Sequence, residues 1–286
     1  MTVRWVLVES EQLPKNSAGS GEDRLLVLED ASGVTCCAVV DGATDKSGRS
    51  YGGVTGGTLA AECVVDVLRR LPPDADPDTG LSAVTQHLSA LRTTWQVADD
   101  DVQAPSAVAA VFLPRRRQLW RVGDIHMAVA CDSRWHAYPA EKGIDHVVAA
   151  ARAALVTCHL VQGGTVDDLA VADPGREMML PLLQRQNALA NTDIPLGFGV
   201  LDGRTVPSRF LEVIDLADDV TEIVLATDGY LAPAPTLREA EEELAASLTA
   251  DPLRIGKHAA TKAVTPGADS FDDRTYVRLR RAPTTT

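Results

Sequence analysis

The sequence predicts an α+β fold in which two antiparallel sheets pack against each other and helices cover them from outside. The first observation is the order of the expected elements: strands, two helices, strands, helices, and then strands and helices to the end. A doubly wound parallel sheet would require strict alternation of strand and helix, and this order lacks it. The second observation is that 45% of the 286 residues are hydrophobic, which supplies a sizeable core. The strands of each sheet are therefore expected to come from distant parts of the chain.

Three short strands are expected within the first fifty residues, followed by two helices. The segments "VRWVLVE", "RLLVLED" and "VTCCAVV" are rich in β-branched residues and are bounded by turn residues, which predicts an antiparallel meander. From residue 54 the apolar residues recur with the period of a helix, and "LPPDADP" ends that helix. A second helix carries one apolar side, made of Leu81, Val84, Leu88, Leu91 and Trp95.

The middle of the chain is expected to contain more strands and then two helices. Between residues 106 and 138, apolar runs are separated by turn-forming residues, which predicts a second meander. Helices are expected near residues 145–160 and 174–190. Asp173 is the expected N-cap of the latter helix, and Pro181 is expected to kink or break it.

The last third of the chain is expected to supply the remaining strands and helices. The segments "SRFLEVIDL" and "TEIVLATDG" predict two strands. A capping box from Thr236 to Glu239 predicts an acidic helix, and the Asp251-Pro252 pair predicts the start of another. The alternating segment "DRTYVRLR" predicts a closing strand.

Composition and charge exclude several classes of partner. The formal net charge of −13 repels phosphate backbones and anionic membranes, so neither nucleic acid nor a membrane is expected as a partner. The five cysteines show no zinc-site spacing and are expected mostly in the core. The first residues lack the pattern of a secretory signal, and no later apolar run approaches a membrane-spanning length. We therefore expect a cytoplasmic protein.

Carboxylates recur where apolar strands end. Asp41 follows "AVV", Asp124 follows "LWRVG", Asp228 follows "IVLAT", and an acidic pair precedes each of the segments "RLLVL" and "RTYV". A single Asp-Gly pair is typical of a turn. Carboxylates grouped at the end of a core need cations, because burial without a partner costs several kcal/mol or more. Their recurrence, with no organised His or Cys, favours the hard cations Mg²⁺ or Mn²⁺.

These segments resemble those of the metal-dependent protein phosphatases, the PPM or type 2C-like serine/threonine phosphatases, and the chain is similar to a divergent bacterial member. The resemblance lies in "GEDRLLVLED", "AVVDGATDKSG", the strand-hairpin-strand from Ser106 to Ala130, "LATDGY" and "SFDDRTYVRL", in this order. It implies one four-layer α-β-β-α sandwich, with a single domain over residues 1–281 and a flexible tail at 282–286. It also implies hydrolysis of phosphomonoesters, from phosphoserine or phosphothreonine in protein, by a metal-activated water.

The resemblance implies binding of two or three Mg²⁺ or Mn²⁺ ions. Asp41 would bridge two ions with the Gly42 carbonyl beside it, Asp228 and Asp272 would complete one site, and Asp124 would belong to a third, weaker site. Asp41, Asp228 and Asp272 would thus be the catalytic residues. The acidic pair of "GEDR" would serve the second site, so the implied metal-binding residues are Glu22, Asp23, Asp41, Gly42, Asp124, Asp228 and Asp272.

Two residues typical of the family are not found in this sequence. The basic residue that usually precedes "NEDR" and holds the substrate phosphate is replaced by Ala18 or a neighbour, and no His follows the Asp-Gly pair to protonate the leaving group. We expect Lys46 or Arg49 to bind the phosphate, unless they are solvated loop cations. Asp45 is a candidate proton donor or outer-shell ligand. Among the six histidines, His126 is the one expected near the metals.

Two alternatives to a protein phosphatase stay open. A pseudophosphatase would keep the fold as a regulatory binding module and would have lost turnover with the two missing residues. A phosphatase for small molecules could use the same scaffold, because a fold does not determine a substrate.

Overall fold

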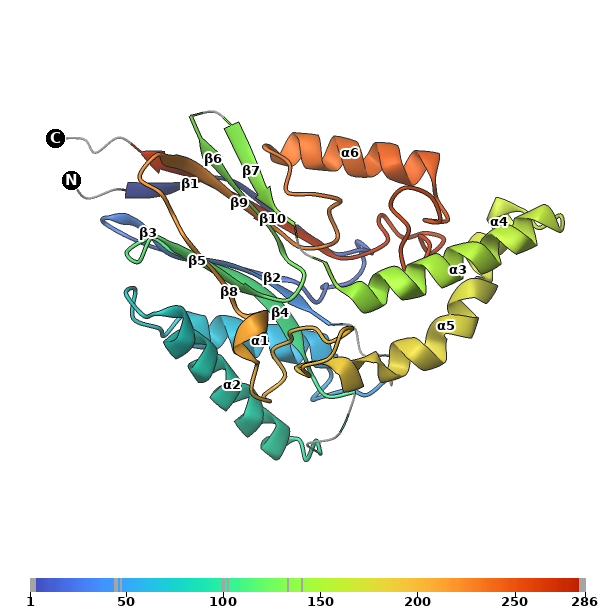
Figure 1. The fold of residues 1–286 in the computed structure, drawn as a ribbon, viewed down its shortest axis with the longest axis horizontal. Coiled ribbons are helices and arrows are strands. Elements are labelled where there is room, and N and C mark those ends of the chain that lie inside the picture. Colours follow the sequence, from blue (N-terminus) through green and yellow to red (C-terminus); the bar gives the residue numbers. More distant parts are fainter. Residues whose placement is uncertain are drawn as a thin grey trace.

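The computed structural model describes residues 4–43, 46, 48–98, 101, 103–132, 134–139 and 141–282. In this part of the chain two five-stranded antiparallel sheets lie face to face, with helices on both outer sides (Figure 1). This is the α+β sandwich that the sequence predicts. Thr44 and Asp45, and the last four residues of the expected tail, lie outside the described residues.

Each sheet combines strands from both ends of the chain. The first sheet has the order β1 (Arg4–Leu13), β10 (Arg274–Ala282), β9 (Val220–Ala226), β6 (His126–Cys131) and β7 (Arg134–Tyr138). The second sheet has the order β2 (Arg24–Asp30), β3 (Gly33–Gly42), β4 (Ala107–Leu113), β5 (Gln118–Val122) and β8 (Glu212–Asp215). Both predicted meanders are therefore wrong in part. β1 pairs with β10 instead of β2, and the β4–β5 and β6–β7 hairpins belong to different sheets.

Helices cover both sheets and extend from one end of the sandwich. Apolar side chains of α1 (Gly56–Leu68) and α2 (Pro77–Thr94) pack on the outer face of the second sheet. The side chains of α6 (Leu237–Ala250) pack on the outer face of the first. Three further helices form an arm beyond the sheets (Figure 1): α3 (Gly143–Val161), α4 (Val166–Val171) and α5 (Pro174–Arg185). Short 3₁₀ helices follow at Gln186–Leu189 (η1) and Ser208–Phe210 (η2).

The predicted helix boundaries are partly right. Asp173 caps α5 and Thr236 caps α6, each through a side-chain oxygen that accepts a backbone N–H in the first turn. α5 runs through Pro181 to Arg185, since one proline removes one backbone hydrogen bond and the rest of the ladder persists. The helix expected at Asp251 does not form. Its carboxylate instead accepts the backbone N–H groups of Ile255 and Gly256, which bends the chain into a loop.

The arm helix α3 is long and apolar enough to cross a membrane, judged by length and composition alone, and 28% of it is buried. The expectation that no apolar run approaches that length is therefore wrong for this helix. Its middle carries Arg152, which is fully buried and forms an ion pair with Asp173 at 2.7 Å. In this structure α3 thus packs through a charged side chain as well as through apolar ones.

Strand β3 explains how the fold delivers a carboxylate to the end of the sandwich. Cys37 and Val39 pack in the core between the sheets, whereas Ala38 and Val40 pack toward the helices. Side chains alternate between the two faces of a strand, so Asp41 lies on the same side as Val39. The strand therefore ends with a carboxylate that faces the gap between the two sheets.

Candidate metal centre

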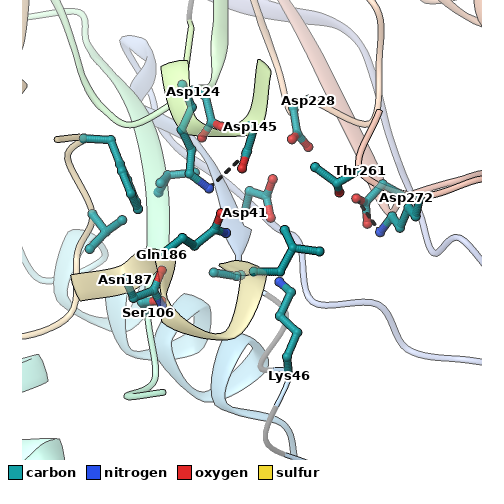
Figure 2. Close-up of a pocket in the computed structure, with 18 of the residues that line it drawn as sticks. Asp41, Lys46, Ser106, Asp124, Asp145, Gln186, Asn187, Asp228, Thr261 and Asp272 are labelled. Atoms are coloured by element: carbon teal, nitrogen blue, oxygen red, sulfur yellow. Dashed lines mark ion pairs between the residues drawn. The ribbon is translucent and has the colours of Figure 1, made fainter. Parts of the chain in front are cut away.

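A cavity of about 160 Å³ lies where several strand ends meet, and four predicted metal-binding carboxylates line it. Asp41 comes from the end of β3, Asp124 from the turn after β5, Asp228 from the residues after β9, and Asp272 from those before β10. Gly42 lines the same cavity, and so does Asp145 of α3, which the sequence did not indicate. Figure 2 shows the carboxylates of Asp41, Asp228 and Asp272 directed toward a common space.

Two of these carboxylates, Asp41 and Asp228, have a raised pKa. Desolvation raises the pKa of Asp41 well above its ordinary value, and the charges of Asp23 and Asp228 raise it further. Asp228 is exposed toward the cavity, and desolvation by the cavity wall together with the charges of Asp124 and Asp272 raises its pKa to about 8. The cavity thus concentrates negative charge that a bound cation would stabilise.

Positively charged side chains also surround this cavity, and the sequence pattern indicated few of them. The chain has only five lysines, and four of them border the centre. The Lys262 Nζ is 2.7 Å from Asp272 Oδ2, and the Lys142 Nζ is 3.0 Å from Asp145 Oδ2 (Figure 2). The scarcity of lysine in a chain rich in arginine was the signal that could have found them.

Lys15 supplies a cation where the family resemblance indicated a missing one. Its Nζ lies 3.7 Å from Asp272, 3.8 Å from Asp273 and 4.0 Å from Glu22. Burial would raise the pKa of Asp272, but Lys262 and Lys15 hold it below its ordinary value. Lys15 stands just before the segment around Ala18 in which no basic residue was expected, and it lies beside Asp272 and Asp273.

Glu22 and Asp23 do not line the cavity in the described structure. The Glu22 Oε1 accepts the hydroxyl of Thr55 at 2.5 Å, beside the start of α1. The Asp23 Oδ2 accepts the hydroxyls of Thr227 at 2.9 Å and Thr275 at 3.0 Å. Asp23 thus ties the second sheet to strands of the first.

The two predicted phosphate ligands lie in different places. Lys46 lines the cavity and approaches its centre from the side opposite Asp228 (Figure 2). Desolvation lowers its pKa to about 8, with a contribution from Lys142. Arg49 forms an ion pair with Asp101 and is not among the described residues that line the cavity.

His126 lies beside the centre, in an adjoining cavity that also contains Asp124. One ring nitrogen, Nε2, is 3.1 Å from the Tyr230 carbonyl oxygen. Desolvation lowers the pKa of His126, and the hydrogen bond to Tyr230 opposes this. His126, the histidine expected near the metals, thus lies beside Asp124 and forms a hydrogen bond with the backbone of Tyr230.

The donor set fits a divalent cation, although its carboxylates are spread around the cavity. The lining oxygens of Asp41, Asp124, Asp228 and Asp272, with the Gly42 carbonyl, are the hard ligands that Mg²⁺ and Mn²⁺ prefer. Within the described residues, no three His, Cys, Asp or Glu side chains are close enough to hold one ion. Two of the cavity's carboxylates are instead paired with lysine ammonium groups.

Comparison with known proteins gave structural matches alone. No protein-family model matches the sequence, and no curated protein matches it. The Mycobacterium tuberculosis serine/threonine phosphatase PstP/Ppp aligns with 98% of this chain and 99% of its own, at 15% identity and a TM-score of 0.48. The PstP catalytic domain in complex with two manganese ions aligns with 98% of this chain and 99% of its own, at 14% identity and a TM-score of 0.49. The Staphylococcus aureus serine/threonine phosphatase Stp1 aligns with 99% of this chain and 98% of its own, at 13% identity and a TM-score of 0.48. The proteins in these three structures are serine/threonine phosphatases.

Proposed function

We propose that this chain is a Mg²⁺- or Mn²⁺-dependent phosphatase that hydrolyses phosphoserine or phosphothreonine in protein. The observation that carries the proposal is the meeting of Asp41, Asp124, Asp228 and Asp272 on one cavity, although they come from distant strand ends. A structural role for four turn aspartates would not require their side chains to share a space. The raised pKa of Asp41 and Asp228 supports a site made to hold cations.

The carboxylates and the Gly42 carbonyl would hold the metal ions. When bound, a pair of such ions activates a water molecule and neutralises the charge of the phosphoryl group. Asp41 would be able to share ions with either group of carboxylates, because it lies at the end of β3 with Asp124 on one side and Asp228 and Asp272 on the other (Figure 2). Asp23 would support the site from behind by fixing the distance between the sheets at this end.

The lysines would bind and orient the phosphate. Lys46, Lys142 and Lys262 line the cavity together with Arg176, so phosphoryl oxygens would meet positive charge on several sides. An ammonium group binds phosphate as a compact point charge and needs no fixed planar geometry. Lys46 would take the role that family members give to an arginine elsewhere, because it comes from the segment after Asp41 and lines the cavity.

A pseudophosphatase is the second candidate, and one observation favours it. The Lys262–Asp272 and Lys142–Asp145 pairs give two carboxylates of the cavity a cation from the chain itself. Such pairs would stabilise the fold without metal. In that case the chain would bind phosphorylated protein and release no phosphate.

Phosphate release decides between these candidates. Purified protein would be assayed with p-nitrophenyl phosphate and with a phosphothreonine peptide, in Mn²⁺ and in EDTA, beside Asp41→Asn. Hydrolysis of both substrates by wild type in Mn²⁺, with loss of about a hundredfold or more in EDTA and in the variant, is the expected result. Release that is equal in wild type and Asp41→Asn would refute the phosphatase proposal.

A further inference from the structure

A second cavity of about 580 Å³ adjoins the metal centre and shares Asp228 and Asp272 with it. Its other walls are α3, the residues that follow Asp228, and the loop of residues 253–262 between α6 and β10. A molecule bound at the carboxylates would therefore extend into this cavity. The side chains that line these other walls would then contact the part of the substrate next to its phosphorylated residue.

Those walls are basic in an otherwise acidic protein. Apart from carboxylates shared with the first cavity, the described lining contains no Asp or Glu. It does contain positive or titratable side chains from the loop and from α3, namely His146, Arg254, Lys257, His258 and Lys262. The chain has a formal net charge of −13 and five lysines, so two lysines and an arginine on one loop are a local exception.

Arg254 is the buried member of this group and its hydrogen-bonding capacity is not filled. The residue is 4% exposed, and its Nε and Nη1 have no hydrogen-bond partner within the described residues. Its guanidinium carbon lies 3.9 Å from the centroid of the Phe271 ring, and this cation–π contact holds the group against one wall. A buried donor without an acceptor costs about 1–3 kcal/mol, so an acceptor from a ligand would stabilise it.

The loop that presents Arg254 is fixed by several contacts. The Arg152 guanidinium donates to the carbonyl oxygens of Leu253, Arg254 and Ala260, at 2.8, 3.1 and 3.0 Å. Arg254 itself has φ of +54°, a strained conformation for a residue with a side chain. The surrounding structure therefore holds the guanidinium in a defined place before any ligand binds.

We propose that Arg254, with Lys257 and Lys262, forms an anion subsite for a second acidic group of the substrate, next to the phosphoryl group that is hydrolysed. The proposal rests on the proposed phosphatase function. The recognised chemistry is a carboxylate or phosphate oxygen, and the substrate class is a phosphoprotein segment with Asp, Glu or a second phosphorylated residue beside the phosphorylated one. Arg254 would supply paired N–H donors from its planar guanidinium, and the two lysines would supply charge.

The test compares two peptides that differ only beside the phosphothreonine, one with Asp and one with Ala. Binding is measured first, by fluorescence anisotropy in Mn²⁺, with a nonhydrolysable phosphonate in place of phosphothreonine. Wild type is compared with Arg254→Met, which can still pack on Phe271, and with Lys257→Gln, an exposed site where folding is not at risk. Arg238→Gln, on the exposed face of α6, is the charge-matched control.

We expect wild type to bind the Asp peptide about tenfold more tightly than the Ala peptide, and Arg254→Met to lose that preference. Lys257→Gln should reduce it by about twofold to threefold, and Arg238→Gln should keep it. In turnover assays with Mn²⁺, Arg254→Met and Lys257→Gln should lower kcat/KM for the Asp peptide and leave kcat/KM for p-nitrophenyl phosphate unchanged, and Arg238→Gln should change neither.

Other results would overturn the subsite. Equal loss for both peptides and for p-nitrophenyl phosphate would place Arg254 on the phosphoryl group that is cleaved or in the fold itself. An Asp preference that survives both variants would show that the anion binds elsewhere. If wild type hydrolyses neither substrate but shows the Arg254-dependent preference in binding, the phosphatase proposal fails and the subsite stands.

Discussion

Asp23 links the two sheets directly behind the metal centre. Its carboxylate, 2% exposed, accepts the hydroxyls of Thr227 after β9 and Thr275 of β10. Burial raises the pKa of Asp23 to about 7, against the opposing effect of the two hydroxyl hydrogen bonds. The family resemblance of "GEDR" implied a metal site for this residue, but its hydroxyl partners are far away in the chain and no local pattern reveals them.

The raised pKa of Asp23 predicts how stability depends on pH. The folded state holds the proton up to about pH 7, whereas the unfolded state loses it near pH 4. The folded chain therefore binds more protons between these values, and the contribution of Asp23 to the free energy of unfolding falls as pH rises through that window. Asp23→Asn cannot titrate, so its melting temperature relative to wild type should increase from pH 5 to pH 8.

Thermal unfolding in EDTA measures the difference in melting temperature between Asp23→Asn and wild type. Each kcal/mol of difference in the free energy of unfolding should shift the melting temperature by about 2–4 °C. Asp23→Ala is the control, because it lacks the acceptor and should be less stable by about 1–3 kcal/mol at both pH values. A difference between Asp23→Asn and wild type that is the same at pH 5 and pH 8 would contradict the assignment.

Among the helices and loops, the arm and the 253–262 loop act as one unit. Arg152 in α3 donates to three carbonyl groups of the loop, and Arg176 in α5 donates to the Thr261 carbonyl oxygen at 2.8 Å. The sequence predicted two of the three arm helices, α3 and α5, yet it also predicted a helix where this loop lies. The helix was predicted from the local sequence Asp251-Pro252 alone. The contacts that hold the loop instead come from residues about a hundred positions away, which local propensity does not reflect.

Arg152→Met is predicted to loosen this loop. The change leaves the Asp173 carboxylate and three carbonyl oxygens without their donor, which costs about 3–5 kcal/mol for a buried pair. Lys257 should then become a site of faster cleavage by a protease specific for lysine, because opening of the loop exposes it. Mass spectrometry of the fragments measures the rate at this bond.

Arg238→Met serves as the control for that experiment, because Arg238 is an exposed arginine paired within α6. It should leave both the stability and the cleavage rate unchanged. Cleavage after Lys257 at the same rate in Arg152→Met and wild type would show that Arg152 does not hold the loop.

The sequence alone predicted strands but not which strands pair with each other. The burial alternation in β1 is the same whichever strand lies beside it, so the sequence indicated a strand there and not its partner, β10. Lys15 was missed for a similar reason. Its position depends on Asp273, whose carboxylate accepts the backbone N–H groups of Lys15 and Glu22 at 2.7 Å.

The distribution of charge in the whole molecule fits the proposed activity. Of 27 Lys and Arg residues, the five lysines all lie in or beside the two adjoining cavities, while arginines such as Arg115 and Arg238 pair with carboxylates elsewhere on the surface. A net charge of −13 would repel phosphorylated proteins, so a local excess of cations would mark where such a substrate can approach. The carboxylates were predictable because each lies next to the end of an apolar strand, whereas the lysines lie on loops and helix starts that carry no such pattern.

Metal binding and phosphate release, measured on the same samples, test the proposed centre most directly. Wild type, Asp41→Asn and Asp228→Asn would be titrated with Mn²⁺ by calorimetry, and p-nitrophenyl phosphate hydrolysis would be followed at each point. Asp66→Asn, an exposed change on α1, is the control. We predict that wild type binds two or more ions and that its activity rises with occupancy, as in Asp66→Asn, while Asp41→Asn and Asp228→Asn lose both. Wild type that binds no Mn²⁺, or that releases phosphate equally well without it, would contradict the assignment of this cavity as a metal-dependent phosphatase site.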